Sequence, residues 1–250
     1  MSTDIDMYIS GIGNIPSGEY NNVSVVGSGH LTGKVCCVSF SSSGSSKGED
    51  IECAESFKTS GNSHFSGNIK AADVKVSGSL HCEGELAAKG SFSSSGSTKC
   101  SKNIKCEQLI VSGSLNAGGN IESKTVKIDG TVNCAGLLNA EDIEIKFDKG
   151  RMNIGGIGGS KIVIVSEKAF DVSIRLPLFS SLIDLTKSAS DGITVNSSIE
   201  GNEIALEHVT CPRVTGRAVA IGQGCNIDLV QYSEDIEISP DAKVGKSEKI

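Results

Sequence analysis

Nine cysteines and four histidines are the residues of this chain best suited to chemistry. Zinc sites in proteins combine thiolates and imidazoles, usually with two cysteines only a few residues apart. The sequence has no C-x-x-C pair, and its one mixed cluster, His208, Cys211 and Cys225, lacks a fourth ligand at a suitable spacing. We therefore expect a turn at that cluster and no metal site.

Many of the cysteines occupy equivalent positions of a sequence repeat, where other copies of the repeat carry alanine. One set of positions holds Cys37, Cys53, Ala71, Ala88, Cys106, Ser123 and Ala140, and another holds Cys82, Cys100, Ala117 and Cys134. Because free cysteine packs as a small hydrophobe, this exchange indicates buried filler rather than ligands. The odd cysteine count and an N-terminus without a secretory signal predict a reducing cytoplasm rather than a disulfide framework.

A glycine-rich motif and the histidines are the other candidates for chemistry. The stretch GGIGGSK at 155–161 superficially resembles a phosphate-binding loop. It lacks the G-x-x-x-x-G-K-[ST] spacing, and the run IVIV follows it where such a loop needs a helix. His30, His64 and His81 fall in or beside expected turns, and His208 lacks an obvious catalytic partner. The sequence therefore predicts no cofactor and no enzymatic activity.

Composition narrows the class of protein further. The chain of 250 residues is 38% hydrophobic, which is enough for a core, and has 30 glycines and no tryptophan. Its net charge is −7 and it has no stripe of lysines and arginines, so a nucleic-acid partner is not expected. No run of 18 apolar residues occurs, so no membrane-spanning helix is predicted.

A repeat of about 17 residues organises the first half of the chain and predicts the fold. Its markers are Gly27, Gly44, Gly61, Gly78, Gly96, Gly113 and Gly130, and the residue four positions before each of them is apolar: Val23, Phe40, Phe57, Val74, Phe92, Leu109 and Val126. Around these positions apolar residues alternate with polar ones, as in short strands that face a core. Short strands that turn every few residues and return in register predict an all-β fold, a parallel β-helix or solenoid with about 17 residues per coil.

The regularity fades after Phe147, and the remainder is expected to differ. Short apolar runs continue there, including those at 162–165, 172–174, 182–185 and 236–238. We expect a leader or cap at 1–22, a regular β-helix at 23–147, and an irregular continuation with a charged tail at 148–250. A separate small β-sandwich is the alternative for this last region.

Enzymes and sugar-binding proteins built on β-helices form a rival functional class. Glycan binders of this type present aromatic faces for stacking, whereas the three tyrosines here are scattered. Acyltransferases built from hexapeptide repeats need a six-residue period, which the sequence does not show. A carbohydrate-active or carbohydrate-binding β-helix stays as the alternative function.

Two stretches and the repeated V-S-G-S-L units together resemble the bactofilins, in particular the longer Firmicutes-type polymer-forming cytoskeletal proteins. The stretches are ISGIGNIPSGEYNNVSVVGSGHLTGKV at 9–35 and CPRVTGRAVAIGQGCNIDLVQYSEDIEISPDAKV at 211–244. The resemblance implies a right-handed β-helix, self-assembly into filaments without nucleotide, and no catalytic site. The chain departs from shorter bactofilins in its long second half, in lacking Pro-rich tails, and in lacking an obvious membrane-targeting peptide.

The open ends of a β-helix supply a physical route to self-assembly. Each end exposes unpaired backbone groups and a section of the apolar core, and neither end of this sequence shows a strong helical cap. We expect the first and last regular coils to make the contacts, through Val23, Val25, Leu31, Ile227, Leu229, Ile236 and Ile238. A charge at Val25 is expected to block elongation.

The expected partner is therefore a second copy of the chain, to which other proteins are recruited. The expected location is the cytoplasm. Peripheral association with the inner membrane face is left open.

Overall fold

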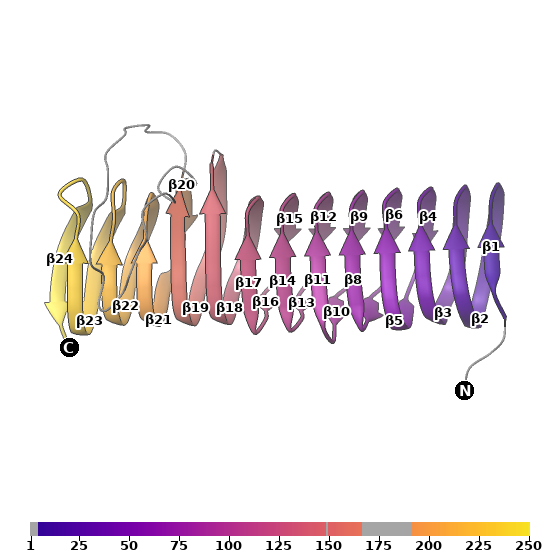
Figure 1. Ribbon diagram of the computed structural model, residues 1–250, viewed down its shortest axis with the longest axis horizontal. Coiled ribbons are helices and arrows are strands. Elements are labelled where there is room, and N and C mark those ends of the chain that lie inside the picture. The colour runs from indigo at the N-terminus through magenta and orange to yellow at the C-terminus, as the bar shows by residue number, and fades with distance from the viewer. Residues whose placement is uncertain (1–4, 149, 167–191) are drawn as a thin grey trace. The chain divides into compact units, whose positions relative to one another are not determined.

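The computed structural model describes residues 5–148, 150–166 and 192–250, and within these ranges all regular structure is β, with no helix (Figure 1). The chain divides into two compact units, residues 1–124 and 125–250, which we call the N-terminal and C-terminal units. The strands of the N-terminal unit are β1 (Met7–Ile9), β2 (Ile12–Val25), β3 (Ser28–Ser42), β4 (Ser45–Gly48), β5 (Ile51–Thr59), β6 (Asn62–Phe65), β7 (Ile69–Ala71), β8 (Asp73–Val76), β9 (Ser79–Cys82), β10 (Leu86–Ala88), β11 (Ser91–Ser94), β12 (Ser97–Cys100), β13 (Ile104–Lys105), β14 (Gln108–Val111), β15 (Ser114–Ala117) and β16 (Ile121–Glu122).

Parallel ladders of the N-terminal unit confirm the predicted solenoid. Each strand pairs in parallel with the strand about 17 residues away, so that equivalent residues of the repeat become neighbours. One ladder brings together the predicted apolar column, which consists of Val23, Phe40, Phe57, Val74, Phe92 and Leu109. Two further ladders run through β4, β6, β9, β12 and β15, and through β7, β10, β13 and β16.

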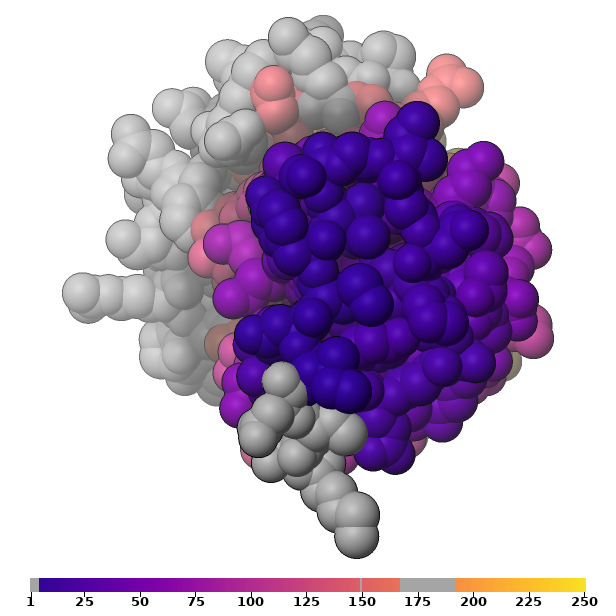
Figure 2. Space-filling model, turned by 90° about the vertical axis from the view of Figure 1, so that its right-hand side faces the viewer, coloured from indigo at the N-terminus to yellow at the C-terminus, as the bar shows by residue number. Residues whose placement is uncertain are grey.

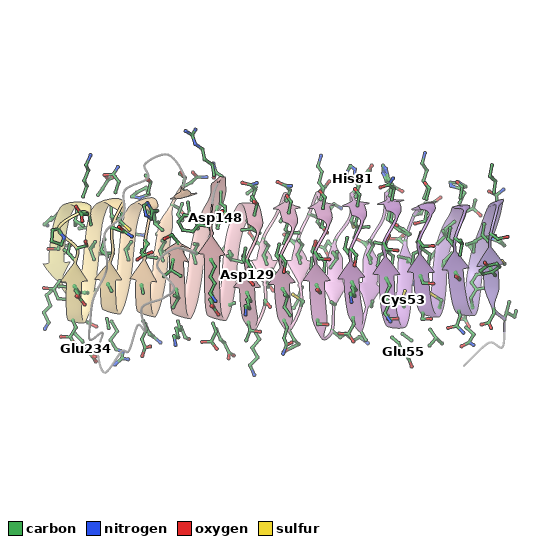
Figure 3. All side chains as sticks on the ribbon, turned by 45° about the horizontal axis from the view of Figure 1, so that its top comes forward. Cys53, Glu55, His81, Asp129, Asp148 and Glu234 are labelled. Carbon is green, nitrogen blue, oxygen red and sulfur yellow. The ribbon has the colours of Figure 1, made fainter. Side chains whose placement is uncertain are left out.

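Alternation of apolar and polar residues places the core inside each coil. In β8, Val74 and Val76 are buried, whereas Asp73 and Lys75 are exposed. Exposed side chains such as Glu55 project away from the coils (Figure 3). Three phenylalanines reinforce the core: Phe40 stacks on Phe57 at a centroid distance of 5.0 Å, and Phe65 meets both rings edge-on. Such aromatic pairs add about 1 kcal/mol each beyond area burial.

The C-terminal unit repeats this construction with less regular coils. Its strands are β17 (Thr125–Ile128), β18 (Thr131–Phe147), β19 (Arg151–Ser166), β20 (Gly192–Val195), β21 (Ser198–Leu206), β22 (Val209–Ile221), β23 (Asn226–Ile238) and β24 (Lys243–Lys249). They also pair in parallel, and Val126, Ile143, Ile162, Ile204, Val219 and Ile236 succeed one another in one ladder. The described part of this unit is therefore solenoid and not a β-sandwich.

Coil length varies in the C-terminal unit, as the fading repeat suggests. Ile162 lies beside Ile143, 19 positions earlier, whereas Val219 lies beside Ile204, only 15 positions earlier. The apolar runs at 172–174 and 182–185 lie outside the described residues.

Residues 7–22, expected to be a leader or cap, instead form strands that continue the solenoid. Met7 pairs with Val23 and Ile15 pairs with Leu31, so this stretch forms a coil of its own ahead of the regular repeat. We call residues 5–20 the first coil. The regular coils thus begin one turn earlier in the sequence than the repeat suggests.

Candidate functional site

The outer edge of the first coil is an open, apolar surface. Within the described residues, β1 pairs with one strand only, the Val23–Val25 part of β2, and residues 12–20 of β2 pair only with β3. Three large apolar side chains are exposed on this coil: Ile12 at 95%, Tyr8 at 64% and Ile5 at 55%. Figure 2 looks onto this end of the unit, where the indigo residues of the first coil form the surface.

A column of glycines ends at this edge and leaves a vacant position there. A Cβ on Gly27 would lie 2.1 Å from the carbonyl oxygen of Gly11, and a Cβ on Gly44 would lie 1.9 Å from that of Gly27. Glycine is therefore required wherever one coil lies on another at this corner. At Gly11 the corresponding Cβ would meet nothing within 4 Å. Within the described residues, nothing occupies at the first coil the position that each earlier coil fills for its successor.

The last coil of the C-terminal unit presents a different, more charged edge. Within the described chain, residues 235–238 of β23 pair only with β22, and β24 pairs only with β23. This edge carries Lys243, Lys246 and Lys249, and Lys246 forms an ion pair with Glu248. Charged side chains on an edge strand oppose the addition of another strand.

The seven residues predicted to form self-assembly contacts differ in how exposed they are in the structure. Val23, Val25 and Leu31 are each 1% exposed: they face the core, and the first coil pairs with the strands that carry them. Ile227 is also buried, under Val244 of β24, and Leu229 is half-buried beside Lys246. Ile236 is half-buried and Ile238 is exposed, and both lie on the unpaired edge of β23.

Sequence reasoning missed the exposed residues Ile5, Tyr8 and Ile12 because it placed the first coil after residue 22. Two signals in the sequence could have found that coil. Gly11 extends the glycine column by one repeat before Gly27. The residues Ile5, Met7 and Ile9 alternate with polar or aromatic ones, as a strand requires.

The cysteines lie where the repeat predicts, mostly as buried thiols. Burial raises the pKa of Cys106 to about 11 and that of Cys225 to about 12, so both stay protonated at neutral pH. Within the described residues, no group of three or more histidine, cysteine and acidic side chains could hold a metal ion. His208 packs edge-on against Phe147 at a centroid distance of 6.0 Å. The GGIGGSK motif lies within strand β19 and not in a loop before a helix.

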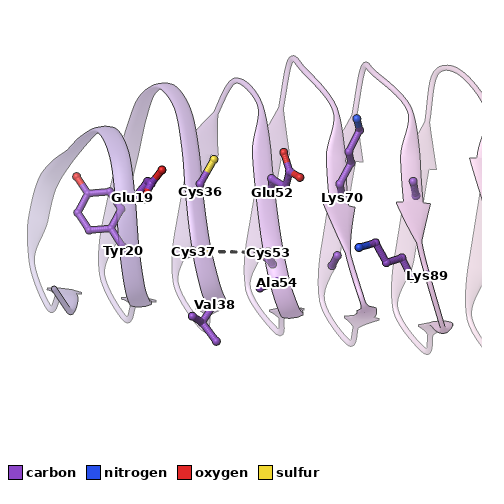
Figure 4. Close-up of a pocket in the computed structure, with 12 residues that line it drawn as sticks. Glu19, Tyr20, Cys36, Cys37, Val38, Glu52, Cys53, Ala54, Lys70 and Lys89 are labelled. Atoms are coloured by element: carbon purple, nitrogen blue, oxygen red, sulfur yellow. Dashed lines mark hydrogen bonds between the residues drawn. The ribbon is translucent and has the colours of Figure 1, made fainter. Parts of the chain in front are cut away.

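A shallow groove of about 520 Å³ follows the β7 ladder of the N-terminal unit (Figure 4). Glu19, Glu52, Lys70 and Lys89 are among its lining residues. The groove has one aromatic residue in its lining, Tyr20, which is 8% exposed and whose hydroxyl donates a hydrogen bond to the carbonyl oxygen of Pro16. Tyr20 therefore presents little aromatic face for a sugar ring.

Among the described residues, no helix is long and apolar enough to cross a membrane.

Comparison with known proteins gives two relatives, both described as uncharacterized. The chain is 29% identical over 116 residues to protein YhbE of Bacillus subtilis (strain 168), a match that spans 46% of this chain and 44% of YhbE. It is 25% identical over 115 residues to YhbF of the same organism, spanning 46% of this chain and 42% of YhbF. The chain thus spans less than half the length of these curated relatives. No family model and no solved structure matches.

Proposed function

We propose that this chain is a non-enzymatic structural protein of the bactofilin type, which self-assembles without nucleotide into filaments or oligomers and serves as a cytoplasmic scaffold for other proteins. The observation that carries the proposal is the open first coil, with Ile12 95% exposed on an edge that has no second strand within the described residues.

Strand addition is the physical basis of the proposed assembly. An edge strand presents backbone N–H and C=O groups that can pair with another chain, and exposed apolar residues add burial to that pairing. Proteins that remain monomeric usually protect such edges with charged side chains. The first coil has two acidic residues: Asp6 accepts hydrogen bonds from the backbone and side chain of Asn22 in the next coil, and Glu19 is an exposed residue in the lining of the groove.

Exposed apolar area supports the first coil as the main contact surface. Full burial of an apolar side chain such as isoleucine stabilises a contact by about 1.5–3 kcal/mol. The first coil carries three exposed apolar side chains, Ile5, Tyr8 and Ile12. At the C-terminal edge, by contrast, lysines outnumber apolar residues in β24. Ile236 and Ile238 remain the predicted contacts at that second edge.

A single substitution tests the proposal. Ile12→Asp replaces an apolar side chain beside the proposed added strand with a charge, and charged side chains on an edge strand oppose strand addition. Ser45→Asp is the matched control, because Ser45 is exposed and continues the ladder of Ile12 and Ser28 in a covered coil. Val25→Asp is a poorer probe, since Val25 is buried and a charge there would also disrupt the core.

Negative-stain electron microscopy and sedimentation velocity, without nucleotide, are the measurements. We expect filaments or large oligomers from the original chain and from Ser45→Asp, and smaller species from Ile12→Asp with an unchanged circular dichroism spectrum. Monomers in all three samples would refute self-assembly. If those monomers bound glycans, the carbohydrate-binding alternative would replace the proposal.

A further inference from the structure

Two cysteines lie side by side in the lining of the groove on the β7 ladder. Cys37 of β3 and Cys53 of β5 are register partners on neighbouring coils. Their sulfur atoms are 3.6 Å apart, as the dashed line in Figure 4 marks. Both line the groove, where Cys37 is 6% exposed and Cys53 is 4% exposed.

The backbone geometry at this pair is compatible with a covalent link. Neighbouring strands lie about 4.8 Å apart, which falls within the range of Cα separations of about 4.4–6.8 Å found across disulfides. The two sulfurs would have to approach to about 2.05 Å. The register shifts between Cys37 and Ser39, an irregularity that gives the backbone local freedom beside the pair.

We propose that Cys37 and Cys53 form an oxidation site, at which a peroxide converts the two thiols into a reversible disulfide between neighbouring coils. The groove gives a small oxidant access to the two thiols, and the register of β3 and β5 holds the two sulfur atoms close together.

The chemistry balances with hydrogen peroxide as the oxidant. The thiolate of one cysteine attacks one peroxide oxygen, the O–O bond breaks, and hydroxide leaves and is protonated to water, so that this cysteine becomes a sulfenic acid. The sulfur of the other cysteine then attacks the sulfur of the sulfenic acid, the S–O bond breaks, and a second water leaves. Two thiols lose two electrons and two protons, and one peroxide is reduced to two waters.

Electrostatics at the pair favour the reaction with peroxide. A hydrogen bond from the Cys53 thiol stabilises the Cys37 thiolate and lowers the pKa of Cys37. The same hydrogen bond, together with burial, raises the pKa of Cys53. The hydrogen bond thus stabilises one thiolate in the pair, which attacks the peroxide, while the other thiol resolves the sulfenic acid.

A second pair of cysteines provides an internal control. Cys82 and Cys100 are also register partners on neighbouring coils. They are 0% and 1% exposed, and both thiols donate to backbone carbonyl groups, among them Gly67 for Cys82 and Gly84 for Cys100. A hydrogen bond with Cys82 lowers the pKa of Cys100, but neither cysteine of this pair lines the groove, so access to the oxidant differs between the two pairs.

The test is mass spectrometry of the full-length chain after brief exposure to hydrogen peroxide, followed by unfolding, alkylation and tryptic digestion. We expect a cross-linked peptide that joins residues 35–47 to 48–58 and disappears after treatment with dithiothreitol. Cys82 and Cys100 should remain alkylated. Alkylation of all nine cysteines would refute the proposal. Oxidation of Cys82 and Cys100 to the same extent would show that the groove does not decide which pair is oxidised.

Two variants assign the sulfur atoms. Cys37→Ala should abolish the cross-link without unfolding the chain, because alanine occupies the same ladder at Ala71 and Ala88. Cys36→Ser should retain it, since Cys36 is the neighbouring half-buried cysteine on the same tryptic peptide. A cross-link that survives in Cys37→Ala, or is lost in Cys36→Ser, would show that Cys36 is the true partner and would overturn the assignment.

Discussion

Ser42 carries a buried hydroxyl that the surrounding core does not satisfy. The side chain is 3% exposed, and within the described residues its oxygen has no hydrogen-bond partner. Its neighbours along the ladder are Val25 on one side and Thr59 on the other, followed by Val76. The Thr59 hydroxyl differs from that of Ser42 because it forms a hydrogen bond of 2.7 Å with Ser63.

We expect Ser42→Val to raise the free energy of unfolding by about 1 kcal/mol, because it removes an unsatisfied polar group and buries more apolar area. Thr59→Val is the matched control and should lower that free energy by about 1 kcal/mol, since it breaks a hydrogen bond. Urea denaturation in the Ile12→Asp background, where assembly does not add to stability, measures both. Equal destabilisation by the two substitutions would mean that the Ser42 hydroxyl is satisfied after all.

Side chains that reach from one coil to the next connect the turns of the N-terminal unit. Oδ1 of Asp50 accepts a hydrogen bond from the backbone N–H of Asn68 at 2.7 Å, and Oδ1 of Asn68 accepts one from Glu85 at 2.9 Å. Oδ1 of Asp73 likewise accepts from both the backbone N–H and the hydroxyl of Ser91. These acceptors satisfy backbone donors at corners where the strand ladder is interrupted.

The Asp73 link should make the stability of this corner depend on pH. The hydroxyl and backbone donors of Ser91 hold the pKa of Asp73 below its usual value. A carboxyl group whose pKa is lowered by folding contributes stability above its unfolded pKa of about 3.9, and that contribution is lost as pH falls through the folded pKa.

We expect Asp73→Ala to reduce the free energy of unfolding by less than about 1 kcal/mol at pH 7, because Asp73 is exposed and solvent screens it. At pH 3 or below the difference from the original chain should shrink. Denaturation curves at both pH values measure it, and Ser91→Ala should reduce the pH-dependent part by removing one donor. A difference that stays constant over this range would rule out the charged form as its source.

Repetition explains how much of the fold could be predicted from the sequence. Residues in equivalent repeats must stack, so the column from Val23 to Leu109 and the parallel coils followed directly from the spacing. The later coils could not be aligned in this way because their lengths change. Ile204 and Ile221 are 17 positions apart in the sequence, yet Ile204 lies beside Val219 and Ile221 beside Leu206.

The edge residues were harder to predict than the coils. A column of buried residues has the same apolar pattern whether it lies in the second coil or at the end, so Val23 and Val25 could not be distinguished from a terminal position. Ile12 is an outward-facing position, as its exposed ladder partners Ser28 and Ser45 show, so its exposure follows from the alternation once the first coil is recognised. The pairing of Cys37 with Cys53, by contrast, could be predicted, because the repeat places both at equivalent positions despite a step of 16 residues between them.

Association of whole molecules can be probed at the vacant position beside Gly11. In the covered coils, a Cβ at this corner would strike the carbonyl group of the preceding coil: the distance is 1.9 Å for Gly61 and 2.2 Å for Gly78. We therefore expect Gly61→Ala to be strongly destabilising. Gly11→Ala should leave the stability of the unit unchanged, because its Cβ meets nothing within 4 Å.

The same substitution reports on how a second copy docks, if the proposed assembly is correct. A neighbouring chain that stacks on the first coil as one coil stacks on another would bring a carbonyl group against the new Cβ of Gly11→Ala. Assembly should then weaken at least about tenfold, a cost of about 1.4 kcal/mol, while the melting temperature of the unassembled chain stays the same. Sedimentation velocity over a concentration series measures the change. A continued coil cannot accommodate a methyl group at this corner. Unaltered assembly of Gly11→Ala, together with loss of assembly in Ile12→Asp, would therefore mean that the copies do not extend the solenoid. They would instead meet through the exposed apolar side chains.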